Sequence, residues 1–126
     1  MIDHISIAVA DLERARAFYD AVLAPLGYSR LTNDDHSSGY GNERDEFTIN
    51  AGDAPKGTSP QGHIAFTAPG RSAVHEFYEI ALKNGAGDNG APGIRAQYHE
   101  NYYAAFVIDP DGHKIEAVCY RPEPQT

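Results

Sequence analysis

The stretch GHIAFTAPGRSAVHEFY, residues 62–78, repeats the pattern of DHISIAVADLERARAFY, residues 3–19. Each copy starts with a histidine, His4 or His63, inside a short run of alternating apolar residues. A phenylalanine–tyrosine pair follows in both copies, with the phenylalanine 14 positions after the histidine, and the copies are 59 residues apart. An internal repeat of this length indicates a duplicated structural unit more strongly than any single propensity does.

Each half of the chain has the pattern of one strand, one helix and then three strands. In the first half, Asp11 is a suitable N-cap and Gly27 a suitable helix end, with strands expected at 4–9, 28–32, 37–41 and 46–50. In the second half, we expect Ser72 to cap a helix that stops near Gly85, with strands at 63–67, 94–98, 102–109 and 113–120. A linker rich in glycine and proline, 52–62, joins the halves, and the tail 121–126 should be loose.

These patterns predict an α+β fold made of two tandem βαβββ modules. Residues 1–126 form a single domain, with module one at about 1–52 and module two at about 62–121. Paired edge to edge, the modules would form a curved mixed sheet, a cup with the helices on its outer face. The pairing is possible within one chain or across a dimer.

Composition excludes several classes of function. The formal charge of −8 argues against nucleic acid or an anionic membrane as partner. Cys119 is the only cysteine, so no intrachain disulfide can form, and it is expected in the core. The sequence shows no signal peptide and no apolar run long enough to span a bilayer, so we expect a soluble, cytoplasmic domain.

Three side chains of metal-ligand type are predicted on one face. In the final strand, apolar residues alternate with Glu116, whose face also carries Lys114, Val118 and Tyr120. The same alternation puts His4 and His63 on the cup side of their strands. Two imidazoles and one carboxylate form a facial ligand set that leaves metal positions open for water or substrate. A duplicated scaffold without metal is the alternative.

The motifs HISIAVADLERARAFYDAVLAPLGY, HIAFT…FYEIAL and FVIDPDGHKIEAV resemble the vicinal-oxygen-chelate superfamily, over nearly the whole chain. This superfamily includes glyoxalase I, fosfomycin- and bleomycin-resistance proteins and extradiol dioxygenases, and the chain looks most like its small bacterial glyoxalase-like members. The resemblance implies one divalent metal ion, manganese, nickel, zinc or iron, held by His4, His63 and Glu116. It also implies a homodimer.

The chain departs from the glyoxalase I pattern at Thr48, where that enzyme carries a glutamate implicated in proton transfer. His99 or Glu100 is a candidate for the missing catalytic group. Residues expected to line the substrate pocket are Ser6, Thr48, Thr67, Tyr98, Tyr102 and Tyr103, with Tyr40 and Asn50 as weaker candidates. Among the nearby basic residues Arg95, Lys114 and Arg121, only Lys114 is predicted on the cup face.

The first functional hypothesis is a metal-dependent lyase, isomerase or thiol transferase that stabilises an oxyanion or enediolate on a small oxygenated substrate. The alternative is a non-catalytic protein of the bleomycin-resistance type that binds a small molecule or drug. An extradiol-type dioxygenase ranks lower, because those enzymes are about twice as long. The DPDG sequence is expected to be a turn rather than a calcium loop, with His36, His75 and His113 exposed or structural.

Overall fold

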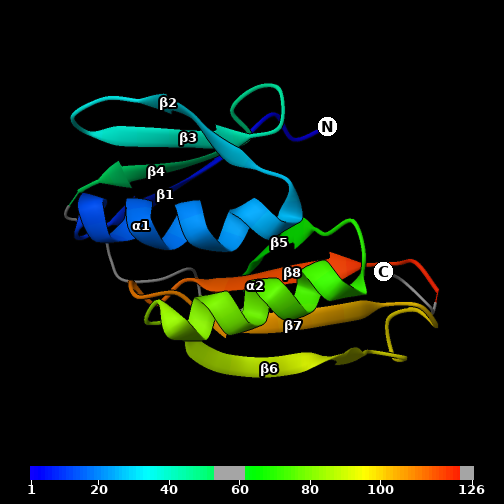
Figure 1. The fold of residues 1–126 in the computed structure, drawn as a ribbon. Coiled ribbons are helices and arrows are strands. Elements are labelled where there is room, and N and C mark those ends of the chain that lie inside the picture. The colour runs from blue at the N-terminus through cyan, green and yellow to red at the C-terminus, as the bar shows by residue number, and fades with distance from the viewer. Residues whose placement is uncertain (53–61, 123–126) are drawn as a thin grey trace.

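The computed structural model describes residues 1–52 and 62–122, in which two four-stranded sheets each carry one helix (Figure 1). Module one contains β1 (Ile5–Val9), α1 (Leu12–Leu23), the short 3-10 helix η1 (Ala24–Leu26), β2 (Ser29–Asn33), β3 (Ser37–Gly41) and β4 (Phe47–Ala51). Module two contains β5 (Ile64–Thr67), α2 (Arg71–Lys83), β6 (Gly87–Ile94), β7 (Tyr103–Ile108) and β8 (Lys114–Cys119). The α+β class and the duplicated βαβββ order are confirmed.

The two sheets have the same topology, β1-β4-β3-β2 and β5-β8-β7-β6. The first strand of each module pairs parallel with the last, and the other pairings are antiparallel. Consequently β4 and β8 are inner strands, whereas β1 and β5 are edge strands. No ladder joins β1 to β5 in the described part of the chain, so backbone pairing does not close a cup within one chain.

The helix boundaries follow from their caps. Asp11 has an extended backbone and its carboxylate accepts a hydrogen bond from Arg14 N at 3.1 Å, so the predicted N-cap of α1 is confirmed. Gly27 ends η1 with φ of 92°, a conformation that costs glycine little. The N-cap of α2 is Gly70, which is extended, so Ser72 was the wrong residue for this cap and lies inside the helix.

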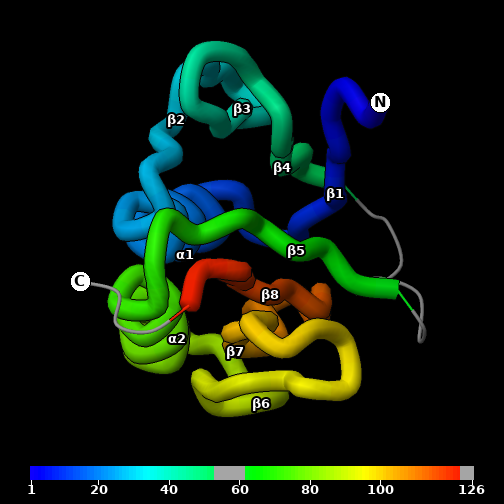
Figure 2. Tube along the Cα trace, turned by 90° about the vertical axis from the view of Figure 1, so that its right-hand side faces the viewer, coloured from blue at the N-terminus to red at the C-terminus, as the bar shows by residue number. Residues whose placement is uncertain are grey.

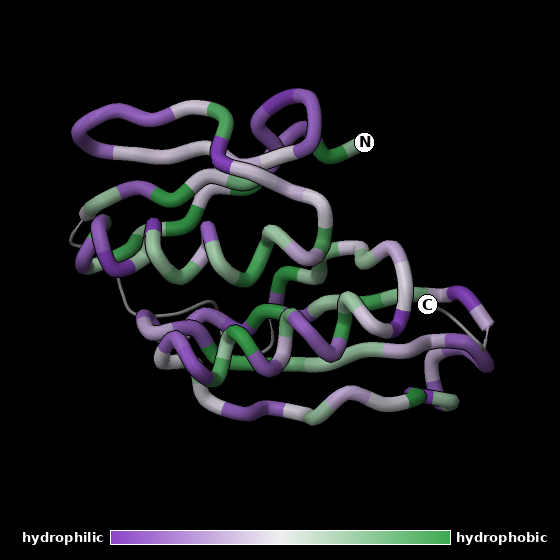
Figure 3. Tube along the Cα trace, viewed as in Figure 1, coloured by the Kyte–Doolittle hydropathy of each residue, from purple (hydrophilic) through white to green (hydrophobic). Residues whose placement is uncertain are grey.

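One continuous core joins the modules. Each helix packs on its own sheet, α1 and α2 contact each other, and the rings of Phe47 and Phe66 meet across the boundary at 5.1 Å. In Figure 3 the turn that joins β2 to β3 is hydrophilic, whereas β8 near the centre is mainly hydrophobic. Within residues 1–52 and 62–122, no helix is long and apolar enough to cross a membrane.

The strand expected at 94–98 is wrong. Strand β6 ends at Ile94, and residues 95–98 begin a turn in which Arg95 O accepts from Tyr98 N at 3.0 Å. Strand β6 instead contains the glycine- and proline-rich stretch 87–94, which tolerates Pro92 because β6 is an edge strand with register shifts on either side of Gly90. The predicted linker and tail lie mostly outside the described residues, at 53–61 and 123–126.

The DPDG turn holds the modules together, and we call its contacts the module clamp. Asp109 accepts from Tyr19 OH at 2.5 Å, Asp111 accepts from Ala10 N at 3.0 Å, and His113 Nε2 donates to Ala8 O at 2.8 Å. Two of the three contacts reach the end of β1. The turn therefore has a structural role, and His113 is buried as a part of it.

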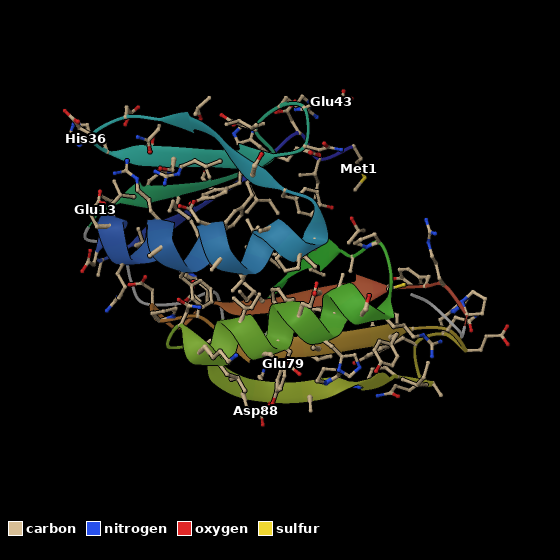
Figure 4. The ribbon with its side chains drawn as sticks, in the orientation of Figure 1. Met1, Glu13, His36, Glu43, Glu79 and Asp88 are labelled. Carbon is tan, nitrogen blue, oxygen red and sulfur yellow. The ribbon has the colours of Figure 1, made fainter. Side chains whose placement is uncertain are left out.

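The β2–β3 turn is fixed to the start of α1. Figure 4 shows His36 in this turn and Glu13 at the start of α1, at the same end of module one. Between them, Arg16 donates to Glu13 Oε1 at 2.6 Å, to Ser38 Oγ at 2.7 Å and to Ser37 O at 3.2 Å. Figure 2 shows α1 along one side of the sheet of module one, and no second helix of the described residues lies on the other side.

Candidate metal centre and ligand cavity

Glu116 lies in the middle of β8, on the face of the sheet away from α2. Its register neighbours are Ala65 on β5 and Phe106 on β7, and the side chain is 0% exposed. Oε2 accepts a hydrogen bond from Tyr102 OH at 2.5 Å. A fully buried carboxylate is costly unless a donor or cation satisfies it, so its remaining oxygen decides what the site can hold.

That remaining oxygen, Oε1, lies 3.0 Å from His63 Nε2. The distance is that of an ion pair, but the two groups lack hydrogen-bond geometry. Oε1 is buried, and it receives no hydrogen bond from the described residues. Two ligands about 2.0–2.2 Å from one metal ion, at 90–109°, lie roughly 2.8–3.6 Å apart. The histidine nitrogen and the carboxylate oxygen therefore fit two adjacent positions on a divalent ion.

His4 lies on the other module, just before β1. Its side chain is 55% exposed, and Nδ1 donates to Asp3 Oδ1 at 2.8 Å. This hydrogen bond, together with the charge of Arg44, lowers the pKa of Asp3. Histidines that bind metal usually donate their other ring N–H to a carboxylate in this way, which leaves Nε2 of His4 free to bind.

A single chain brings together two of the three predicted ligands. Within the described ranges, no group of three histidine, cysteine, aspartate or glutamate side chains is close enough to hold one ion. His63 and Glu116 share a site on module two, and His4 stands apart from them on module one. The residues of one chain therefore fit a divalent ion only in part.

A cavity of about 380 Å³ opens over this pair. Its lining residues are His63, Tyr98, His99, Tyr102, Phe106, Glu116 and Tyr120. Besides the predicted ligands His63 and Glu116, three of them, Tyr98, His99 and Tyr102, are among the residues chosen from the sequence. Burial, and then its hydrogen bond to Glu116, raise the pKa of Tyr102, so its hydroxyl stays a proton donor to the carboxylate.

Other predicted site residues lie elsewhere. Glu100 is exposed and does not line the cavity. Tyr103 points to the helix side of β7, where its hydroxyl meets His75 Nε2 at 2.5 Å. Thr67 lines a second cavity of about 210 Å³ between the modules, and its hydroxyl lies 2.6 Å from Tyr28 OH.

On module one, the open face of the sheet carries Ser6 and Thr48, whose hydroxyls contact each other. Gly39 is the register neighbour of Thr48, and the carboxylate of Asp45 lies over it, 2.4 Å from where a Cβ would stand. Asp45 accepts from Thr32 Oγ1 at 2.5 Å, and its second oxygen is buried without a hydrogen bond from the described residues. A carboxylate therefore lies one register position from Thr48.

Two residues of these surfaces were missed from the sequence, and a third was placed correctly but not chosen. Alternation had put Tyr120 on the face of Glu116, although it was not named as a pocket residue, and Phe106 faces Glu116 across the β7–β8 hairpin, so register could have found it. Asp45 lies between strands and has no periodic signal.

Two βαβββ modules of the same topology, with His63 and the buried Glu116 on one sheet face of the second, define the class of protein to which this chain belongs. The chain belongs to the Glyoxalase/Bleomycin resistance protein/Dioxygenase superfamily, whose family model matches residues 1–117. This match confirms the resemblance seen in the sequence.

Individual relatives cover nearly the whole chain. A glyoxalase/bleomycin resistance protein from Albidiferax ferrireducens T118 superposes with a TM-score of 0.83 at 27% identity, covering 95% of this chain and 98% of that one. The protein YqjT of Bacillus subtilis (strain 168) is 28% identical over an alignment of 125 positions that covers 92% of this chain and 96% of YqjT. The fosfomycin resistance protein FosX of Listeria monocytogenes shares the fold, with a TM-score of 0.70 at 20% identity over 94% of this chain and 91% of its own.

Proposed function

We propose that the protein is a divalent-metal-dependent enzyme of the glyoxalase-like group, acting on a small oxygenated substrate as a lyase, isomerase or thiol transferase. The observation that carries the proposal is Glu116 Oε1, a buried carboxylate oxygen without a hydrogen bond, 3.0 Å from His63 Nε2. A bound divalent ion, manganese, nickel, zinc or iron, acts as a Lewis acid that stabilises negative charge on substrate oxygens.

The chain's own residues position the metal ligands and supply hydrogen-bond donors. Tyr102 fixes one carboxylate oxygen of Glu116, which leaves the other directed at the site. His99, at the margin of the cavity, accepts a hydrogen bond from Asn101 N on Nδ1 at 2.9 Å. In the neutral imidazole, the ring proton is then on Nε2, so the Nε2–H of His99 is a hydrogen-bond donor that suits a negatively charged substrate oxygen.

The third ligand, His4, comes in this proposal from a second copy of the chain. The observations that support a homodimer are the edge strands β1 and β5, the open sheet face on each module, and the separation of His4 from His63 and Glu116. In such a dimer, module one of each copy faces module two of the other, and each dimer contains two sites.

A second candidate function is non-catalytic binding of a small molecule or drug. The observation that favours it is the lining of the cavity, in which every residue except Glu116 carries an aromatic or imidazole ring. A binding groove does not need a metal, so metal content separates the two candidates.

The test is elemental analysis of protein purified without chelator, together with His63→Ala and Glu116→Ala variants. About one divalent ion per chain in the parent, lost in both variants, is the expected result. The matched control is His36→Ala, which removes an exposed histidine outside the site and should retain the metal. A parent without metal that also takes up none of the four ions would refute the enzyme proposal in favour of the binding protein.

A mixed dimer tests the shared site. A dimer of one His4→Ala chain and one Glu116→Ala chain has one intact site if ligands are shared between copies, and none if each site belongs to one chain. Half of the parent's metal content is therefore expected. A mixed dimer without metal would refute the shared site.

A further inference from the structure

The cavity beside Glu116 has a wall of rings that contact one another edge to face or at a tilt. Tyr98 and Tyr102 lie with ring centroids 5.0 Å apart, Tyr102 meets Tyr120 edge to face at 5.2 Å, and Tyr120 meets His99 edge to face at 5.7 Å. These separations are those of favourable aromatic pairs, so each ring holds the next in place. We call these four residues the ring wall.

Two rings of the ring wall are exposed to solvent, although each contacts a neighbouring ring. Tyr98 is 64% and Tyr120 is 53% exposed, so two large rings show more than half of their surface to solvent. Grouped large apolar side chains on a surface commonly mark a binding site. These two rings also line the cavity over the proposed metal centre, so the surface they expose is continuous with that site.

The ring wall is tied directly to the proposed metal ligands. The hydroxyl of Tyr102, the central ring of the wall, donates to Glu116 Oε2 at 2.5 Å. Beyond Glu116, Phe106 is its register neighbour on β7, and the rings of Phe106 and His63 lie 6.3 Å apart at 67°. A group bound between His63 and Glu116 therefore has rings close by on both sides.

The side chains that line the cavity favour a ligand with a flat ring. The seven lining residues contain one carboxylate, two imidazoles and four phenyl or phenol rings, with no lysine or arginine among them. Ring edges and faces bind another flat ring more favourably than they bind a methyl group or a saturated chain. The volume, about 380 Å³, falls within the range of small-molecule pockets, roughly 300–1,000 Å³.

We infer that the substrate carries a flat aromatic ring attached next to the oxygen atoms that meet the metal, and that the ring wall selects it. This inference rests on the proposed metal-dependent function and names the substrate class of that site. Tyr98 and Tyr120 are the residues that determine this specificity, because they are the two tyrosines of the wall that are more than half exposed.

Hydroxamates test the inference, because they bind metal through two adjacent oxygens whatever group is attached to them. Binding of benzohydroxamate, cyclohexanecarbohydroxamate and acetohydroxamate to the metal-loaded protein is measured by titration calorimetry. We expect benzohydroxamate to bind at least tenfold more tightly than acetohydroxamate, with the saturated six-membered ring between them. The saturated ring controls for size, since it has the same number of carbons but is not flat.

Two variants locate the effect. Tyr98→Leu and Tyr120→Leu should each weaken benzohydroxamate binding severalfold more than acetohydroxamate binding, so that the preference for the aromatic ring falls. The matched control is Tyr103→Leu, which removes the tyrosine next to Tyr102 on the opposite face of β7 and should keep the preference.

The outcomes separate this inference from the proposed function. Equal binding of the three hydroxamates to a protein that contains metal would overturn the inference and leave the metal centre intact. An equal loss of preference in Tyr103→Leu would also overturn it. A protein that holds no metal and binds none of the three would overturn the proposed function, and the inference with it.

Discussion

The hydrogen bond from Tyr102 to Glu116 makes a sharp prediction for the Tyr102→Phe variant. The change removes one oxygen atom and keeps the ring, so packing in the ring wall is preserved. That oxygen donates at 2.5 Å to a carboxylate that is 0% exposed, and the other oxygen of the carboxylate has no hydrogen bond from the described residues. The variant therefore leaves a buried carboxyl group without a hydrogen-bond donor from the described residues.

The expected loss follows from the charge. A hydrogen bond to a charged group contributes about 1.5–3 kcal/mol to stability, and we expect the free energy of unfolding to fall by this amount. With an unfolding entropy of about 2.1 cal/mol/K per residue, this loss lowers the Tm of a 126-residue domain by about 6–11 °C. Urea and thermal unfolding of the metal-free protein at neutral pH measure both quantities.

Tyr103→Phe is the matched control. Its hydroxyl is also in a hydrogen bond of 2.5 Å, to His75 Nε2, but that histidine is exposed, so a change within about 0.5 kcal/mol is expected. If Tyr102→Phe is as stable as the parent, or if both variants lose the same amount, the carboxylate does not depend on this donor and our view of the site is wrong.

Three further predictions concern the scaffold. Gly39→Ala places a methyl group against the carboxylate of Asp45 and should cost about 1–3 kcal/mol in urea unfolding, whereas Gly52→Ala meets nothing within 4 Å and should be neutral. Burial first, and then the neighbouring Asp109, hold the pKa of Tyr19 well above 10.0 in the folded chain, so the free energy of unfolding should fall as pH rises above 10. The fall should be less steep in Tyr19→Phe, and equal slopes of the free energy of unfolding against pH, between pH 8 and 11.5, would contradict this. His113→Ala leaves a β1 carbonyl without its donor and should lower the free energy of unfolding by about 1–3 kcal/mol; an unchanged urea midpoint would show that the module clamp adds no stability.

Much of the fold could be predicted from local patterns. The repeat identified both modules, and alternation along the last strand separated Glu116 from its apolar neighbours. Strand β6 could not be predicted, because its glycine- and proline-rich sequence has poor strand propensity and is held in place by its ladder with β7. The cap of α2 was missed because Gly70 caps through its extended backbone alone, without a side-chain hydrogen bond.

The candidate site was predictable within one module and not between modules. Alternation gives the face on which His63 and Glu116 lie, and the structure brings the two together. Alternation does not give the relative placement of two sheets that share no ladder, so the position of His4 relative to His63 and Glu116 could not be derived from the sequence. Asp45 lies over Gly39 because of a loop conformation, which has no counterpart in a periodic pattern.

The module clamp also constrains the order in which the chain folds. The hydrogen bond between Ala8 and His113 spans 105 residues, and that between Ala10 and Asp111 spans 101. During synthesis, the end of β1 therefore cannot form these hydrogen bonds until nearly the whole chain has been made. Contacts that close such long loops form late and slow the folding of a domain. We therefore expect module one to leave the ribosome with its first strand incompletely bonded, so that truncation before Asp109 produces a chain prone to aggregate.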